Sequence, residues 1–204
     1  FKLDRYLQFG SLPRVYLSST PQDELFDYAD TYLREEVQLE AQVRNLPAFA
    51  RFLKVAALAS GQLLNYANAS RDIGLSPNSV KDYFSILSDT LLGFALTPWR
   101  SGNKRKSVAT EKYYLFDLGI MHTLAGTTSL DRNSNLYGQA FEAFIVNEVR
   151  AYCSYRRNRH ELTFWRTKHN EEVDLLIGDL IAIEIKSSQR VDRRDAKGLS
   201  RIAE

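Results

Sequence analysis

Three charged residues stand inside two short apolar segments near the end of the chain. Asp174 interrupts the apolar run at 173–177, and Glu184 and Lys186 interrupt the next run, at 181–186. Both runs have the length and composition of strands, in which unpaired charge is costly to bury. Such residues pair with one another or bind a ligand, and two carboxylates are the oxygen donors that suit Mg²⁺ or Mn²⁺.

The loop between the two strands decides whether their acids can meet. Side chains alternate along a strand, so the apolar residues at 173, 175 and 177 are expected on one face and Asp174 on the other. A two-residue turn at Gly178-Asp179 would set Asp174 opposite Ile183, which mixes charge with core. A three-residue loop, 178–180, sets it opposite Glu184 instead. We therefore predict the three-residue loop, with a cation between the opposed carboxylates.

Composition excludes several classes of protein. The 204 residues allow one large domain or two small ones, and the net charge of +2 excludes a histone-like polycation. The single Cys153 permits no internal disulfide and matches a cytoplasmic location. No apolar run reaches the length of a membrane span, and no signal peptide is visible. The absence of an initial Met and a last segment that reads as a shortened helix predict a fragment of a longer protein.

The first part of the chain, residues 1–123, is predicted to be helical and to end in a winged helix. Helical spacing of apolar residues begins near residue 25, and Pro47 suits the first turn of a helix whose apolar residues run from Phe49 to Leu58. Residues 62–92 predict a helix-turn-helix, with Ser76 as the N-cap of the second helix. Two strand-like segments, 94–99 and 113–116, follow it.

Basic residues between these two strands are the candidate nucleic-acid contacts. The predicted wing carries Arg100, Lys104, Arg105 and Lys106, which could contact phosphates without reading sequence. The second helix adds only Lys81 to this set, so its exposed side is barely basic. Many winged helices bind protein instead, so docking to another domain or subunit is the alternative.

A Thr-, Ser-, Asn- and Gly-rich stretch, 124–136, is predicted to be a linker to a second, α/β domain at 137–204. This domain begins with a strong amphipathic helix, 137–155, whose apolar stripe includes Phe141 and Phe144. Three strands follow, at 162–166, 173–177 and 180–187. The fold class expected for the whole chain is therefore α+β.

Short motifs along nearly the whole chain resemble the C-terminal region of a prokaryotic AAA-type ATPase family. That region is a domain of unknown function, similar to a winged helix followed by a restriction-endonuclease-like, PD-(D/E)XK, domain, which would be truncated here at its C-terminal end. The motifs are Arg51-Phe-Leu, Gly61-Gln-Leu-Leu-Asn65, Ser79-Val80-Lys-Asp-Tyr83, Ile86-Leu87, Phe116-Asp117-Leu-Gly119, Gly138-Gln-Ala-Phe-Glu142 and Trp165-Arg166.

The resemblance implies a nuclease motif made of Glu142, Asp174, Glu184 and Lys186. The three acids would hold Mg²⁺ or Mn²⁺, and Lys186 would orient a water or neutralise charge. The alternative for these residues is a structural cluster of ion pairs. Glu172 is a further candidate ligand on the face of Asp174, although a solvated strand end is the favoured explanation.

The function expected from this family is that of a DNA-interacting part of an ATPase, with a candidate metal-dependent endonuclease site. The alternative is a catalytically inactive module for docking protein or DNA. No phosphate-binding Gly-x-x-x-x-Gly-Lys loop is present, so ATP is expected only in the missing N-terminal half. The expected partners are DNA and that ATPase domain, not a membrane, and a homo-oligomer is left open.

Overall fold

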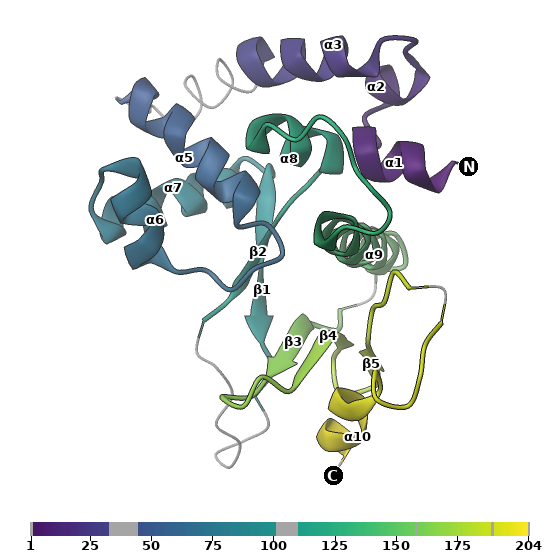
Figure 1. Ribbon diagram of the computed structural model, residues 1–204. Coiled ribbons are helices and arrows are strands. Elements are labelled where there is room, and N and C mark those ends of the chain that lie inside the picture. The colour runs from purple at the N-terminus through teal and green to yellow at the C-terminus, as the bar shows by residue number, and fades with distance from the viewer. Residues whose placement is uncertain (1, 33–44, 101–109, 158, 189, 204) are drawn as a thin grey trace.

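A mixed five-stranded sheet, in the order β2-β1-β3-β4-β5, organises the computed structural model (Figure 1). The structure describes residues 2–32, 45–100, 110–157, 159–188 and 190–203. The strands are β1 (Gly93–Pro98), β2 (Lys112–Leu115), β3 (Leu162–Arg166), β4 (Glu172–Ile177) and β5 (Ile181–Ile183). The helices are α1 (Leu3–Phe9), α2 (Pro13–Leu17), α3 (Pro21–Asp27), η1 (Tyr28–Tyr32), α5 (Leu46–Leu58), α6 (Tyr66–Ile73), α7 (Pro77–Asp89), α8 (Leu118–Ala125), α9 (Asn135–Tyr155) and α10 (Lys197–Ala203). The expected α+β class is confirmed.

The sheet continues from the first part of the chain into the second. Strands β1 and β2 pair antiparallel, as the two strand-like segments predicted. Strand β1 also pairs in parallel with β3, through Thr97 with Thr163 and Pro98 with Phe164. Strands β3, β4 and β5 then pair antiparallel. The hairpin of the first part is thus built into a sheet that the second part completes.

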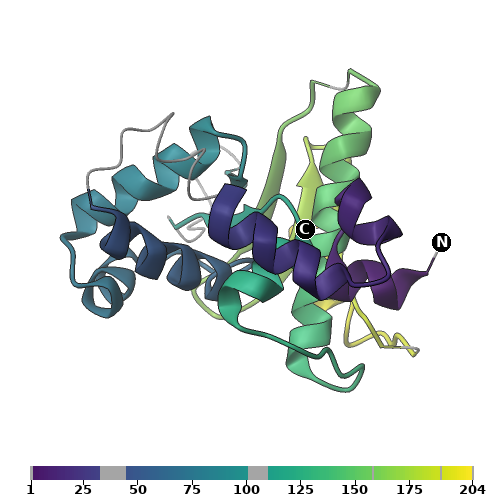
Figure 2. The ribbon, with the colours of Figure 1, turned by 90° about the horizontal axis from the view of Figure 1, so that it is seen from above.

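Helices cover the sheet from both parts of the chain. Seen from above, the blue helices α5 to α7 gather on one side and the long green helix α9 stands on the other (Figure 2). Helix α1 reaches across to α9, where the Tyr6 hydroxyl donates to Glu148 Oε1 at 3.0 Å. One main cluster of buried residues runs through all of these elements, from Phe52 of α5 to Leu175 of β4.

The predicted helix-turn-helix is present as α6 and α7. Gly74 ends α6 in a left-handed conformation, and the Ser76 side chain accepts from the Ser79 amide at the start of α7. The first helix begins later than predicted, at Tyr66, because the Asn65 side chain caps it. Leu63, expected inside that helix, instead forms a β-bridge with Lys112.

The motif at 116–119 packs the start of α8 against the end of α1 and the residues that follow it. Buried Asp117 caps α8 by accepting from the Ile120 amide at 3.1 Å, and it also accepts from the Ser11 amide at 2.7 Å. Gly119 lies so close to α1 that a Cβ there would come within 2.2 Å of the Phe9 carbonyl oxygen. The motif is therefore explained by capping and close packing.

The turn between β4 and β5 has the predicted length. Ile177 pairs with Ile181, which leaves the three residues 178–180 in the loop. Gly178 has a φ of +54°, which is a conformation that glycine adopts without strain.

A β-bulge in β4 overturns the simple alternation expected for that strand. On β3 one residue, Phe164, lies between the partners of Val173 and Leu176, whereas β4 has two there, Asp174 and Leu175. Leu175 accordingly joins the main core, while Val173 and Leu176 join a second cluster against α10. The prediction that 173 and 175 share a face is wrong.

Within the described ranges, no helix is long and apolar enough to cross a membrane.

Candidate functional site

Asp174 lies at the bulge, and its side chain is held from the segment that follows β5. Only 7% of the residue is exposed, and its Oδ2 accepts from the Ile185 amide at 2.7 Å. Leu175 pairs with Ile183, the last residue of β5, and Glu184 follows it directly. The three-residue loop sets this register, so Asp174 and Glu184 each lie next to a member of the last pair.

Two nearby carboxylates perturb Asp174. The pKa of Asp174 is raised to about 7, first by burial and then by the negative charges of Glu142 and Glu184, against the opposing effects of the Ile185 amide and the Lys112 ammonium. The three acids predicted as ligands thus lie within electrostatic reach of one another. Such a shift marks candidate functional acids, although ion-pair networks also produce it.

Lys186 pairs with Glu184 at the edge of this group. Its Nζ lies 2.6 Å from Glu184 Oε1, while Glu184 Oε2 is buried and has no hydrogen-bond partner among the described residues. Burial lowers the pKa of Lys186, but the hydrogen bond and charge of Glu184 outweigh it, and the net shift is upward. A buried carboxylate oxygen without a donor is a position where a cation or a water would be stabilised.

Glu142 is placed by α9 and held from β2. Its Oε1 accepts from the Tyr114 hydroxyl at 2.8 Å and from Lys112 Nζ at 3.0 Å. Lys112 also lies 2.6 Å from Glu172 Oε1, and Arg166 lies 3.1 Å from the other oxygen of Glu172. Burial lowers the pKa of Lys112, but the two glutamates outweigh it and raise the pKa overall.

Lys112 and Tyr114 are residues that the sequence reasoning missed. Lys112 carries charge into a short aromatic strand, which is the same signal that singled out Asp174. Glu172, for which the sequence suggested either a ligand or a solvated strand end, instead forms ion pairs with Lys112 and Arg166.

Two adjoining pockets open onto the acids. The larger, about 1020 Å³, lies between the first turns of α9 and the segment after β5, and both Asp174 and Lys186 line it. The smaller, about 400 Å³, lies on the α10 side and is lined by Glu184 together with the same two residues. Asp174 and Lys186 are therefore reached from both sides.

The described residues include no group of three His, Cys, Asp or Glu side chains arranged to hold a metal ion. The donor chemistry nevertheless fits a divalent cation, because Asp174 and Glu184 are carboxylates and Glu184 Oε2 lacks a donor.

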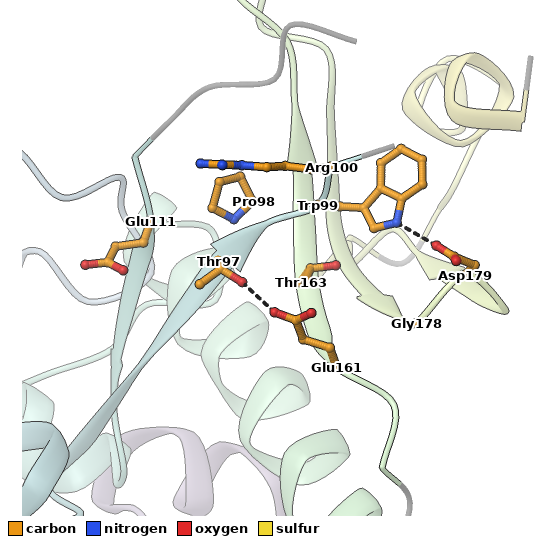
Figure 3. A pocket seen from close by; sticks show the side chains of 9 residues that line it. All are labelled: Thr97, Pro98, Trp99, Arg100, Glu111, Glu161, Thr163, Gly178 and Asp179. Carbon is orange, nitrogen blue, oxygen red and sulfur yellow. Dashed lines mark hydrogen bonds between the residues drawn. The ribbon is translucent and has the colours of Figure 1, made fainter. Parts of the chain in front are cut away.

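The predicted nucleic-acid contacts are described only in part. Arg100 lines a separate pocket of about 570 Å³ at the end of β1, together with the carboxylates Glu111, Glu161 and Asp179 (Figure 3). In this pocket the Trp99 indole donates to Asp179 at 2.8 Å. Lys81 is exposed on α7. Lys104, Arg105 and Lys106 lie outside the described residues.

Two family profiles match the chain. Residues 1–131 match a domain of unknown function, DUF8612, which covers more than half of the 204 residues. The chain belongs to the DUF8612 family. Residues 137–204 match a second domain of unknown function, DUF4143. The DUF8612 segment contributes Lys112 and Tyr114, and the DUF4143 segment contributes Glu142, Asp174 and Glu184.

Relatives of this DUF8612 chain occur in mycobacteria. The uncharacterized proteins Mb2031c of Mycobacterium bovis and Rv2008c of Mycobacterium tuberculosis are each 28% identical over 183 residues, which cover 85% of this chain. The match spans only 40% of the length of each relative. No solved structure matches the chain.

Proposed function

We propose that this chain is the DNA-interacting C-terminal part of an AAA-type ATPase and carries a metal-dependent endonuclease site. The observation that supports it best is that Glu142 and Glu184 lie near Asp174, which is buried and has a raised pKa, and that Lys186 pairs with Glu184. The order of a helical acid, a strand acid and a Glu-x-Lys directly after the next strand resembles that of the restriction-endonuclease-like fold, which we propose for the second part of the chain.

In this proposal Asp174 and Glu184 would hold one or two Mg²⁺ ions, and Glu142 would approach directly or through water. A bound Mg²⁺ would lower the pKa of a coordinated water and stabilise negative charge on a phosphodiester. Lys186 would orient a water or neutralise charge on a phosphate oxygen. Ile185 keeps Asp174 in place through its amide, 2.7 Å from Oδ2.

Plasmid nicking tests the endonuclease directly. The purified chain is expected to convert supercoiled plasmid to the open circle with Mn²⁺ or Mg²⁺ and not with EDTA. Lys186→Ala should abolish nicking while the circular dichroism spectrum and the unfolding temperature stay close to those of the parent.

Lys54→Ala is the matched control, because this lysine is exposed on α5 and lines neither of the two pockets that open onto the acids. It should nick at the parental rate. Unchanged nicking in Lys186→Ala would place the activity elsewhere.

DNA binding through a winged helix is the second element of the proposal. Helices α6 and α7, followed by the β1–β2 pair, have the order of that motif, and Arg100, Lys104, Arg105 and Lys106 follow β1. Replacing Lys104, Arg105 and Lys106 with Ala should flatten the dependence of DNA affinity on salt, since each phosphate contact contributes to the slope. An unchanged slope would reject this surface.

The match covers 40% of the length of each relative, so the relatives are long enough to carry a further domain. We propose that this domain binds ATP, contacts the described chain and works in the cytoplasm. A homo-oligomer is compatible with this arrangement.

A catalytically inactive docking module is the competing proposal. It is favoured by the ion pairs that already occupy Glu142 and Glu184, and by the lack of a three-residue metal cluster among the described residues. DNA or ATPase-domain binding without Mn²⁺ binding or nicking would select it.

A further inference from the structure

Two side chains of β2 hold the same oxygen of Glu142. The Tyr114 hydroxyl donates to Glu142 Oε1 at 2.8 Å, and Lys112 Nζ donates to it at 3.0 Å. Residues two apart in a strand share a face, so β2 presents both donors side by side to α9. Tyr114 is fully buried and Lys112 is 3% exposed. The two donors therefore approach Glu142 from the core.

The second oxygen of Glu142 is left toward the cleft. The Glu142 side chain remains 22% exposed, and it lines the larger pocket with Asp174 and Lys186. Each hydrogen bond and ion pair of Glu142 within the described ranges uses Oε1. A carboxylate fixed at one oxygen and open at the other is oriented in the way that ligating carboxylates are.

The donors come from a different segment of the chain from the acids. Lys112 and Tyr114 lie in the part that matches DUF8612, whereas Glu142 and Asp174 lie in the part that matches DUF4143. Lys112 spans this division further through its contact with Glu172 of β4.

We infer that Tyr114 and Lys112 are positioning residues that aim the free oxygen of Glu142 at the metal position. The acidic site is then a joint product of the two segments. This inference rests on the proposed function, because it assigns Glu142 to a cation, but it concerns residues outside the nuclease motif.

Tyr114 offers the sharper test, because removing its hydroxyl changes no charge. Lys112 is less suitable, since its loss would remove a positive charge from Glu142 and Glu172 and would also increase the attraction of the site for any cation. The neighbouring Tyr113 is a matched control. It is also buried in β2, but its hydroxyl lies 3.3 Å from Ser88 Oγ and 3.5 Å from the Phe84 carbonyl, away from Glu142.

The experiment is a titration of the whole chain with Mn²⁺, with free Mn²⁺ measured by electron paramagnetic resonance. Tyr114→Phe should weaken Mn²⁺ binding by about tenfold, the lower end of the range for partners of ligating side chains. Tyr113→Phe should bind Mn²⁺ as the parent does. Equal affinity in Tyr114→Phe and the parent, or equal weakening in both variants, would overturn the inference.

Failure of the proposed function gives a different result, which is the absence of Mn²⁺ binding by the parent. The inference is then decided by crystal structures of the two variants. The Glu142 carboxylate should rotate in Tyr114→Phe and keep its place in Tyr113→Phe. An unmoved Glu142 in Tyr114→Phe would overturn the positioning role without reference to metal.

Discussion

Asp174 is the residue at which burial and like charge act together. Burial and the neighbouring glutamates raise its pKa from the usual 3.8 to about 7. Between these two values the folded chain holds the proton more tightly than the unfolded chain does. The stability contributed by the protonated group is complete below about pH 4, falls as the pH rises through this window and is lost above about pH 7.

Asp174→Asn should therefore be more stable than the parent at pH 8. Three units of pKa correspond to at most about 4 kcal/mol, and Asn keeps an acceptor for the Ile185 amide. The advantage should shrink as the pH falls toward 4, where the aspartate is neutral in the parent. Urea unfolding at both pH values measures it, and an advantage that does not change with pH would contradict the account.

Lys112 illustrates a charge whose role is to neutralise others. It lies within 3.0 Å of Glu142 and 2.6 Å of Glu172, and its side chain is 4% exposed. Lys112→Met should lower the unfolding free energy by about 3 kcal/mol, the lower end of the range for a broken buried pair, because Glu142 and Glu172 lose Lys112 but are partly exposed and Glu172 keeps Arg166.

Adding Glu172→Gln to Lys112→Met should recover part of this loss, since one of the two carboxylates that lost Lys112 is then replaced by a neutral amide. Lys197→Met, at the exposed position on α10, should change stability by less than about 0.5 kcal/mol. Equal effects of the two methionine variants would show that the Lys112 ion pairs contribute nothing.

At the scale of elements, the start of α8 is fixed by a close approach to α1. Gly119→Ala should destabilise the chain by about 1–3 kcal/mol, because its Cβ would meet the Phe9 backbone. Gly138 is the matched helical glycine in α9, where a Cβ would lie an ordinary 3.6 Å from Ser187 Oγ.

Gly138→Ala should leave stability unchanged or raise it by up to about 1 kcal/mol through helix propensity. Thermal unfolding of the two variants compares them. A Gly119→Ala variant as stable as the parent would mean that α1 and α8 are not packed as described.

The β4–β5 hairpin has one feature that the sequence predicts, the loop length, and β4 has one that it does not, the bulge. Alternation of charge and core predicted the three-residue loop, because a shorter turn would have mixed the two faces. The same alternation missed the bulge at Asp174 and Leu175. That extra residue depends on how β4 pairs with β3, a strand whose register no local pattern specifies.

On the scale of the whole molecule, one sheet and one buried ion-pair cluster join the two family segments. Strands β1 and β3 pair across the division, and Lys112 contacts α9 and β4 across it. Asp174, Glu184 and Lys186 could be singled out from sequence because each interrupts a short apolar segment. The contribution of β2 could not, because it depends on contacts between segments far apart in the chain.

Unfolding should therefore be a single transition. Trp99 at the end of β1 and Trp165 in β3 report from both parts of the sheet, and their fluorescence should change together with the circular dichroism signal. Two separated transitions would show that the segments are stabilised independently.

The central claim is that Asp174 and Glu184 converge on a divalent cation. Crystals of the chain soaked in Mn²⁺, measured at a wavelength where manganese scatters anomalously, test it most directly. We expect an anomalous peak within bonding distance of the carboxylates of Asp174 and Glu184, with Glu142 facing it and Lys186 displaced. A map with no peak there, and with Lys186 still paired to Glu184, would contradict it.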